Sequence, residues 1–131
     1  MNKREIRQGD IYFARLPADK GSVQNGTRPV LITQCNWLNK TSPTVLVATV
    51  TSKLKRLDIA EHVLLPKLKG LPKQSMVETE QRRTLDKSEL LQYLCTVDRV
   101  TMKRISRALR LSEDMEKHKR QFKKQTHRGG R

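Results

Sequence analysis

The sequence predicts an α+β protein built from a small, mainly antiparallel β-barrel and a C-terminal helix. Five or six short runs rich in Val, Ile, Leu and Thr lie between residues 11 and 97, and glycine- or proline-containing turns separate them. One long amphipathic helical pattern is present, and it follows Asp98. The strands do not alternate with long helices as in a parallel βαβ sheet, so an antiparallel arrangement is expected.

The first two strands are expected at residues 11–16 and 28–35, with a loop over residues 17–27 between them. The first run is β-prone, and turn residues bound it at both ends. The loop contains the pair Asn25-Gly26, which favours a tight turn. Its length is near that at which loops without secondary structure usually serve a function.

The middle of the chain is expected to hold a polar loop and a buried strand. Residues 36–43 are polar around one tryptophan and are interpreted as the loop. Residues 45–51 are the most apolar run of the chain and do not alternate cleanly. This pattern predicts a strand that is covered on both faces.

Two shorter strands are expected at residues 62–65 and 75–80. Asp86, followed three residues later by Glu89, resembles the start of a helix. Residues 90–97 fit either a helix or a strand.

The C-terminal helix is expected to begin after Asp98, which can cap it. The pattern predicts one apolar stripe, made of Val100, Met102, Ile105, Leu109 and Leu111. The opposite face is expected to be basic, with Lys103, Arg104, Arg107 and Arg110. Beyond residue 112 the stripe is lost. We therefore expect one domain over residues 1–112 and a basic, flexible tail over residues 113–131.

The charge balance favours a polyanionic partner. The 131 residues carry a formal net charge of +15, from 28 Lys and Arg against 13 Asp and Glu. A generic basic protein, or one that binds an acidic protein, would share this balance. The polar N-terminus has no signal-peptide pattern, and no apolar run approaches the roughly 20 residues of a membrane span. A cytoplasmic protein is expected.

No local pattern indicates a metal or nucleotide cofactor, and none is expected. The histidines, His62, His118 and His127, form no HxxxH or HExxH motif and no Cys/His cluster. Walker A, GxGxxG and GxSxG sequences are also absent.

Arg28 and Thr51 are the candidate catalytic residues. Arg28 follows the long loop and begins a core strand, where a guanidinium can bind two phosphate oxygens and stabilise charge that develops on phosphorus. Its alternative role is an ion pair with Asp10 or Asp19. Thr51 ends the next strand, where its hydroxyl can contact a phosphate. Its alternative role is that of an ordinary β-branched strand residue.

Residues around this pair are candidates for contact with RNA. Gln81 and Arg83 lie on a polar, basic stretch after a strand, where they can contact phosphates or bases, or can simply be solvated. The complete set of expected RNA-binding residues is Gln24, Thr49, Ser52, Lys53, Gln81 and Arg83.

Four ordered blocks resemble the MazF/PemK toxins of type II toxin–antitoxin modules. They are Gln8–Tyr12, Gly21–Leu31 (GSVQNGTRPVL), Ser42–Val45 with Thr51, and Glu80–Asp86 (EQRRTLD). The resemblance covers residues of about 7–112. It implies the SH3-like barrel shared with CcdB and Kid toxins, a homodimer, and an acidic, MazE-like antitoxin as partner.

The resemblance also implies the activity, which is metal-independent, sequence-specific cleavage of single-stranded RNA. Arg28 and Thr51 match the family's catalytic Arg and Thr, and Gln81 and Arg83 match positions implicated in RNA contact. The expected products carry 2′,3′-cyclic phosphate and 5′-hydroxyl ends. Many members have a Glu where this chain has Val23, so the general base is not assigned.

Two other functions remain as alternatives. One is a gyrase-poisoning toxin of the CcdB type, although this chain ends in Gly129-Gly130-Arg131 and lacks the Trp-Gly-Ile terminus associated with that activity. The other is a non-catalytic RNA-binding protein, which the general basicity would permit.

Overall fold

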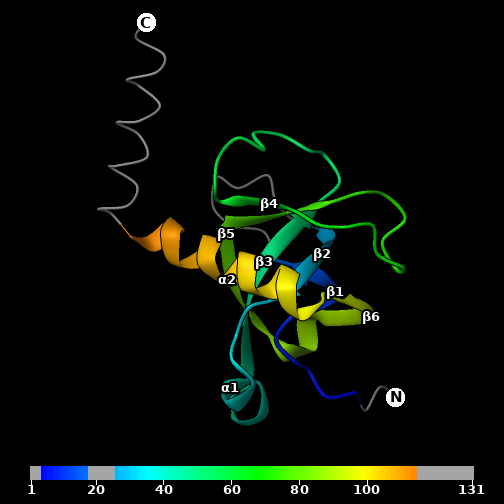
Figure 1. Ribbon diagram of the computed structural model, residues 1–131. Coiled ribbons are helices and arrows are strands. Elements are labelled where there is room, and N and C mark those ends of the chain that lie inside the picture. The colour runs from blue at the N-terminus through cyan, green and yellow to red at the C-terminus, as the bar shows by residue number, and fades with distance from the viewer. Residues whose placement is uncertain (1–3, 18–25, 115–131) are drawn as a thin grey trace, which may run out of the picture.

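A computed structural model describes residues 4–17 and 26–114, which form one antiparallel sheet with helical segments around it (Figure 1). The strands are β1 (Asp10–Leu16), β2 (Gly26–Ile32), β3 (Thr44–Thr51), β4 (His62–Leu64), β5 (Met76–Asp86) and β6 (Leu90–Thr96). The helical segments are α1 (Asn36–Thr41), the 3₁₀ turn η1 (Lys87–Glu89) and α2 (Arg99–Glu113).

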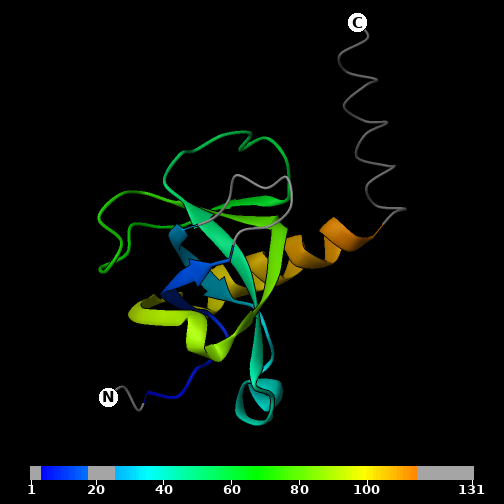
Figure 2. The same ribbon diagram turned by 180° about the vertical axis from the view of Figure 1, so that it is seen from behind.

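The six strands follow the order β4-β5-β3-β2-β1-β6, and every neighbouring pair is antiparallel. Helix α2 crosses one face of the sheet, in front of it in Figure 1 and behind it in Figure 2, and packs on β4 and β5. This arrangement confirms the expected antiparallel sheet with a C-terminal helix.

Two apolar clusters cover the two faces of the central strands. Ile11 and Leu31 belong to the cluster that packs under α2, whereas Tyr12 and Val30 belong to the cluster on the other face. Successive residues of a strand point to opposite faces, which explains the alternation. Strand β3 contributes to both clusters, so the prediction of a strand covered on both faces is confirmed.

The expected loop over residues 36–43 is wrong, because residues Asn36–Thr41 form helix α1. The segment is polar and short, and it has no apolar stripe that a periodicity argument could detect. Asn39 is its buried residue, and its side chain exchanges hydrogen bonds with Gln34. A polar anchor therefore replaces the apolar contact that usually docks a helix.

The expected helix start at Asp86 is also wrong. Asp86 accepts a hydrogen bond from Ser88 N, but it caps only the single turn η1 before β6 begins at Leu90. Strand β5 runs on to Asp86, beyond the predicted end at residue 80, because β3 pairs with it as far as Thr44. Tertiary pairing overrides a local capping signal here.

Helix α2 begins as predicted, since Asp98 Oδ1 accepts a hydrogen bond from Thr101 N at 2.7 Å. Its buried residues are Thr101, Ile105 and Ala108, whereas Val100 is 71% exposed. The predicted stripe was wrong at Val100, because the buried face includes a threonine that an apolar pattern passes over. Among the described residues, no helix has the length and apolar character to span a membrane.

Candidate functional site

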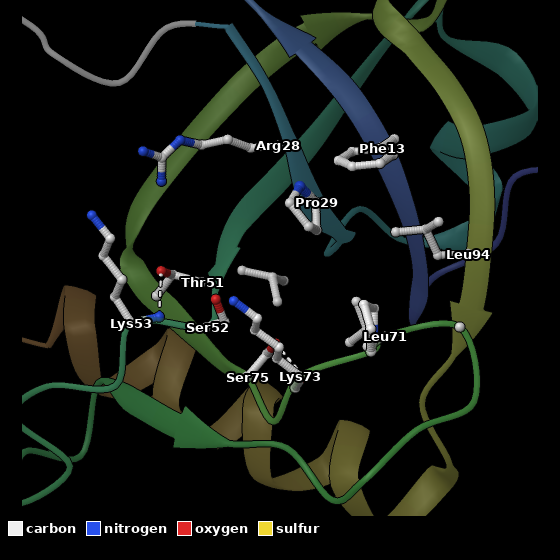
Figure 3. A pocket seen from close by; sticks show the side chains of 13 residues that line it. Phe13, Arg28, Pro29, Thr51, Ser52, Lys53, Leu71, Lys73, Ser75 and Leu94 are labelled. Atoms are coloured by element: carbon white, nitrogen blue, oxygen red, sulfur yellow. Dashed lines mark hydrogen bonds between the residues drawn. The ribbon is translucent and has the colours of Figure 1, made fainter.

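A pocket of about 360 Å³ opens where β1, β2 and the end of β3 meet the loop before β5 (Figure 3). Thirteen residues line it: Phe13, Arg28, Pro29, Val50, Thr51, Ser52, Lys53, Gly70, Leu71, Pro72, Lys73, Ser75 and Leu94. The pocket therefore combines cationic and hydroxyl groups with an apolar surface.

The strand register brings Arg28 and Thr51 to the same pocket. Strands β2 and β3 pair as far as Val30 opposite Thr49. In an antiparallel pair, the residues two positions further on, Arg28 and Thr51, point to the same face as that pair. Both line the pocket where the ladder ends, so the structure brings together the two predicted catalytic residues.

The contacts of these two side chains leave their functional groups available. Thr51 Oγ1 accepts a hydrogen bond from Lys53 N at 3.0 Å, so its own proton remains free to be donated. The Arg28 side chain is half-buried and makes no hydrogen bond or ion pair with any residue of the described ranges. Asp10, one suggested partner, instead contacts Arg7 N and Thr96 Oγ1, and Asp19 lies outside the described residues.

The loop before β5 forms the wall that carries Lys73. Gly70 has a φ of +105°, and a Cβ there would lie 2.2 Å from Leu94 O, so only glycine fits against β6. Leu71 is buried, and Ser75 Oγ donates a hydrogen bond to Lys73 O at 3.0 Å. These contacts fix the loop. Sequence reasoning missed Lys73, although its basic loop lies directly before a predicted strand.

The electrostatics of the pocket suit a phosphate next to a flat apolar group. Its lining includes Arg28, Lys53 and Lys73 and contains no acidic side chain among the residues that the structure describes. Figure 3 shows Phe13 and Leu94 on the side of the pocket away from Lys53. A nucleotide offers both chemistries, because a charged phosphate adjoins a base that can stack.

The other predicted RNA-binding residues fall into three groups. Ser52 and Lys53 line the pocket. Thr49 does not, because it is 2% exposed and its hydroxyl donates to Glu78 Oε1 at 2.8 Å. Gln81 and Arg83 also lie outside the pocket lining: Gln81 is exposed on β5, and Arg83 Nη1 donates to Pro17 O at 2.9 Å. Gln24, like Val23, lies outside the described residues.

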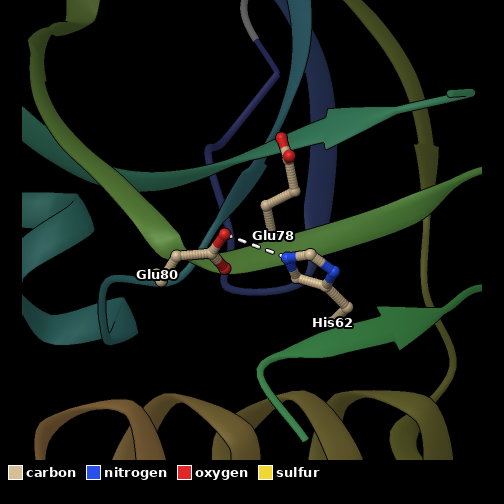
Figure 4. A group of neighbouring side chains, drawn as sticks. All are labelled: His62, Glu78 and Glu80. Carbon is tan, nitrogen blue, oxygen red and sulfur yellow. Dashed lines mark hydrogen bonds and ion pairs between the residues drawn. The ribbon is translucent and has the colours of Figure 1, made fainter. Parts of the chain in front are cut away.

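A second group of titratable side chains, His62, Glu78 and Glu80, lies between β4 and β5 (Figure 4). Their nitrogen and oxygen atoms lie within 4.8 Å of one another, and their types could hold a divalent cation. This group could not be predicted from sequence spacing, because His62 and Glu78 are brought together only by the pairing of β4 with β5.

The contacts of this group are those of an ion-pair cluster. His62 Nε2 lies 2.9 Å from Glu80 Oε2, and His62 Nδ1 lies 2.8 Å from Lys55 O. Lys55 Nζ lies 3.6 Å from Glu78 Oε2. Burial lowers the pKa of His62, but the hydrogen bonds to Glu80 and Lys55 and the two carboxylates outweigh it, so the pKa is raised. The cluster thus favours the protonated form of His62, which together with the Lys55 ammonium balances the two carboxylates.

This chain is similar to known proteins in both sequence and structure. The family described as "PemK-like, MazF-like toxin of type II toxin-antitoxin system" matches residues 7–112. A protein of Staphylococcus saprophyticus named "Endoribonuclease MazF" is 42% identical over 108 residues, which are 82% of this chain and 90% of that protein.

Solved structures share the fold. "Endoribonuclease from Mycobacterial species" has a TM-score of 0.68 at 25% identity and covers 83% of this chain and 91% of its own. "Endoribonuclease in complex with its cognate antitoxin from Mycobacterial species" has a TM-score of 0.70 at 24% identity. The match covers 84% of this chain and 96% of that chain.

Proposed function

Because this chain belongs to the PemK-like, MazF-like family of type II toxin–antitoxin toxins, we propose that it is an endoribonuclease with its active site in the pocket of Arg28 and Thr51. The observation that carries the proposal is the meeting of these two residues in one cationic pocket at the end of the β2–β3 ladder. The name of the relative that is 42% identical supports the same activity.

The reaction is an internal transfer at phosphorus. The RNA 2′-hydroxyl gives up its proton and attacks the adjacent phosphorus, so that a P–O2′ bond forms as the P–O5′ bond breaks and the departing 5′-oxygen takes up a proton. Arg28 binds the non-bridging oxygens and stabilises the charge that builds up on them. Thr51 donates its hydroxyl proton in a hydrogen bond to a non-bridging or leaving oxygen. The products carry a 2′,3′-cyclic phosphate and a 5′-hydroxyl, and DNA is spared because it lacks the attacking group.

Protein cations supply the charge stabilisation in this mechanism, so no metal ion is assigned a step. Lys53 and Lys73 line the pocket beside Arg28 and add to the positive potential at the phosphate. Arg28 stays protonated and is unsuited to act as the general base. That role is left without a residue here.

The remaining RNA contacts extend the site beyond the pocket. Within the pocket, Ser52 and Lys53 are assigned contacts with the scissile phosphate or its neighbour, a role that their position in the lining supports. Gln81 is exposed for contact with bases or phosphates. Arg83 is assigned an RNA contact near Pro17, whose carbonyl oxygen accepts a hydrogen bond from the Arg83 guanidinium. Thr49 stabilises the pairing of β3 with β5 through its hydrogen bond to Glu78. Gln24 is the remaining residue that we assign to RNA contact.

The proposal includes the wider properties of the family. We assign the chain a homodimeric state, a cytoplasmic location and an acidic, MazE-like antitoxin, since one structural neighbour is a complex with its cognate antitoxin. We also assign the sheet to the SH3-like barrel class, and residues 1–112 to one toxin domain. The proposed flexible tail, residues 113–131, lies almost wholly outside the described residues.

The test is cleavage of a long single-stranded RNA in EDTA, followed by mapping of the cut ends. The expected result is a set of discrete cuts with 5′-hydroxyl ends, which disappear in Arg28→Ala. An Arg7→Ala variant removes one exposed arginine elsewhere and should cut normally. Intact RNA with the wild-type protein, together with inhibited gyrase or with binding alone, would instead support one of the two alternative functions.

A further inference from the structure

Helix α2 carries a line of exposed basic side chains on the surface away from the sheet. Arg99, Lys103, Arg107 and Arg110, called here the α2 stripe, line one shallow hollow of about 380 Å³ with Ser106 and Gln8. These positions recur at intervals of three or four residues, so they lie along one side of the helix. The hollow is therefore a strongly cationic surface that is distinct from the pocket of Arg28.

No acidic side chain of the described residues is recorded in an ion pair with the α2 stripe. Glu113, which lies on the same helix, is paired with Arg82. Like charges four residues apart, as in Arg99 with Lys103 and Lys103 with Arg107, repel each other and destabilise a helix. A bound polyanion would remove this repulsion.

We propose that the α2 stripe binds the phosphate backbone of the RNA outside the cleavage pocket, an inference that rests on the proposed function. Residues four positions apart on a helix are separated by about 6 Å along its axis. The stripe therefore presents a row of cations along which the phosphates of one strand can lie. Such contacts position RNA without reading its sequence.

The loop after β3 leads from the cleavage pocket toward α2. The loop after β3 begins with Ser52 and Lys53, which line the cleavage pocket. Its later residues, including Leu57 and Asp58, line a hollow of about 500 Å³ together with Arg104 and Arg107 of α2. An RNA strand that leaves the pocket beside Lys53 thus follows this loop to the stripe.

The chemistry of the hollow favours RNA over an acidic protein segment. Met102 is the apolar residue among those that line it, and the others are basic or polar. Protein segments usually bind through buried aromatic or aliphatic anchors. A backbone of regularly spaced phosphates needs only the cations, and its affinity depends strongly on salt.

The test compares two variants with equal charge loss. Lys103→Gln/Arg107→Gln/Arg110→Gln removes three charges from the stripe, and glutamine keeps a good helix former at each site. Arg7→Gln/Arg15→Gln/Lys40→Gln removes three exposed charges elsewhere. The affinity for a long single-stranded 2′-O-methyl RNA, which lacks the attacking hydroxyl, is measured over a range of salt concentrations.

The expected result is a smaller salt dependence in the stripe variant only. Each lost phosphate contact reduces the slope of log K against log salt by about 0.7, so three contacts predict a reduction of about 2. Cleavage of a short RNA that fills only the pocket should be unchanged. An equal change in the control, or an unchanged slope in the stripe variant, would overturn the proposal.

Two further readouts separate this proposal from the others. If the wild-type protein cuts no RNA but the slope difference persists, the proposed enzymatic function fails while the stripe still binds RNA. If the stripe variant keeps the RNA slope but loses affinity for an acidic peptide, the surface belongs to a protein partner and the proposal is wrong.

Discussion

The hydroxyl oxygen of Thr51 accepts a hydrogen bond from Lys53 N, which leaves the hydroxyl proton to be donated. It can therefore act as a donor to an oxygen of the scissile phosphate. Thr51→Val keeps the shape of the side chain and removes this donor, so kcat is expected to fall by about 10²-fold, as for loss of one oxyanion donor. Single-turnover cleavage measures the effect.

Two matched variants check this prediction. Thr51→Ser keeps the donor and should retain most of the activity. Thr84→Val makes the same change at an exposed position of β5 and should leave kcat as it is. Normal turnover in Thr51→Val would mean that the threonine serves only the strand.

Gly70 fixes the wall that carries Lys73. Gly70→Ala places a Cβ about 2.2 Å from Leu94 O at a φ of +105°, so the loop must move away from β6. We expect a lower Tm and a higher KM for RNA. Gly26→Ala is the control, since its φ is +91° but nothing lies within 4 Å of the added Cβ. Equal losses in both variants would show that backbone strain, about 1–2 kcal/mol, explains the effect without the clash.

At the scale of single residues, the sequence predicted Arg28 and Thr51 as site residues, because local features mark Arg28 and the family blocks pair it with Thr51. Lys73 was not identified, because its place in the pocket depends on how tightly Gly70 packs against β6. Thr49 was expected near RNA, but its partner is Glu78 on the neighbouring strand. Which face a strand residue uses follows from register, and a bulge in β5 obscures that register.

At the scale of elements, we expect the protonation of His62 to stabilise the pairing of β4 with β5. The pKa of His62 is raised in the folded protein, so its stabilising contribution is fully present below its unfolded pKa of about 6.5. The contribution is lost as the pH rises through the higher folded pKa. The stability difference between wild type and His62→Gln should therefore shrink as the pH rises from about 6.

Urea unfolding at a series of pH values measures this difference. Subtracting the variant from the wild type cancels the titration of the other histidines. Glu80→Gln removes the carboxylate that lies 2.9 Å from His62 Nε2 and should flatten the same pH dependence. A difference between wild type and His62→Gln that stays constant with pH would show that folding leaves the pKa of His62 unchanged.

An element could be predicted from the sequence where local signals determine it, and could not where tertiary contacts do. Strands β1 and β3 were found because apolar runs bounded by turn residues are local signals. Helix α1 was missed because its anchor is a buried Asn39, and the second half of β5 was missed because only pairing with β3 keeps this polar stretch extended. The edge strand β6 was ambiguous in the sequence, because its extended form depends on pairing with β1.

At the scale of the whole molecule, the two apolar clusters share the same central strands. Val50 belongs to the cluster under α2, and Val47 belongs to the cluster on the other face. Each is fully or almost fully buried, so Val→Ala at either site should cost about 2 kcal/mol. Because β3 joins the clusters, each variant should shift one cooperative transition in far-UV circular dichroism. A second transition in either variant would contradict this coupling.

The pocket lining has a practical consequence for any assay of this protein. Its described residues include three cations and no acid, so we expect the pocket to attract small oxyanions as well as the proposed RNA substrate. The fragment that ends in a cyclic phosphate keeps its charge at that terminus, whereas the fragment with a 5′-hydroxyl does not. The first product should therefore leave more slowly and inhibit turnover. Phosphate or sulfate buffers should compete in the same way, so the choice of buffer becomes a kinetic variable.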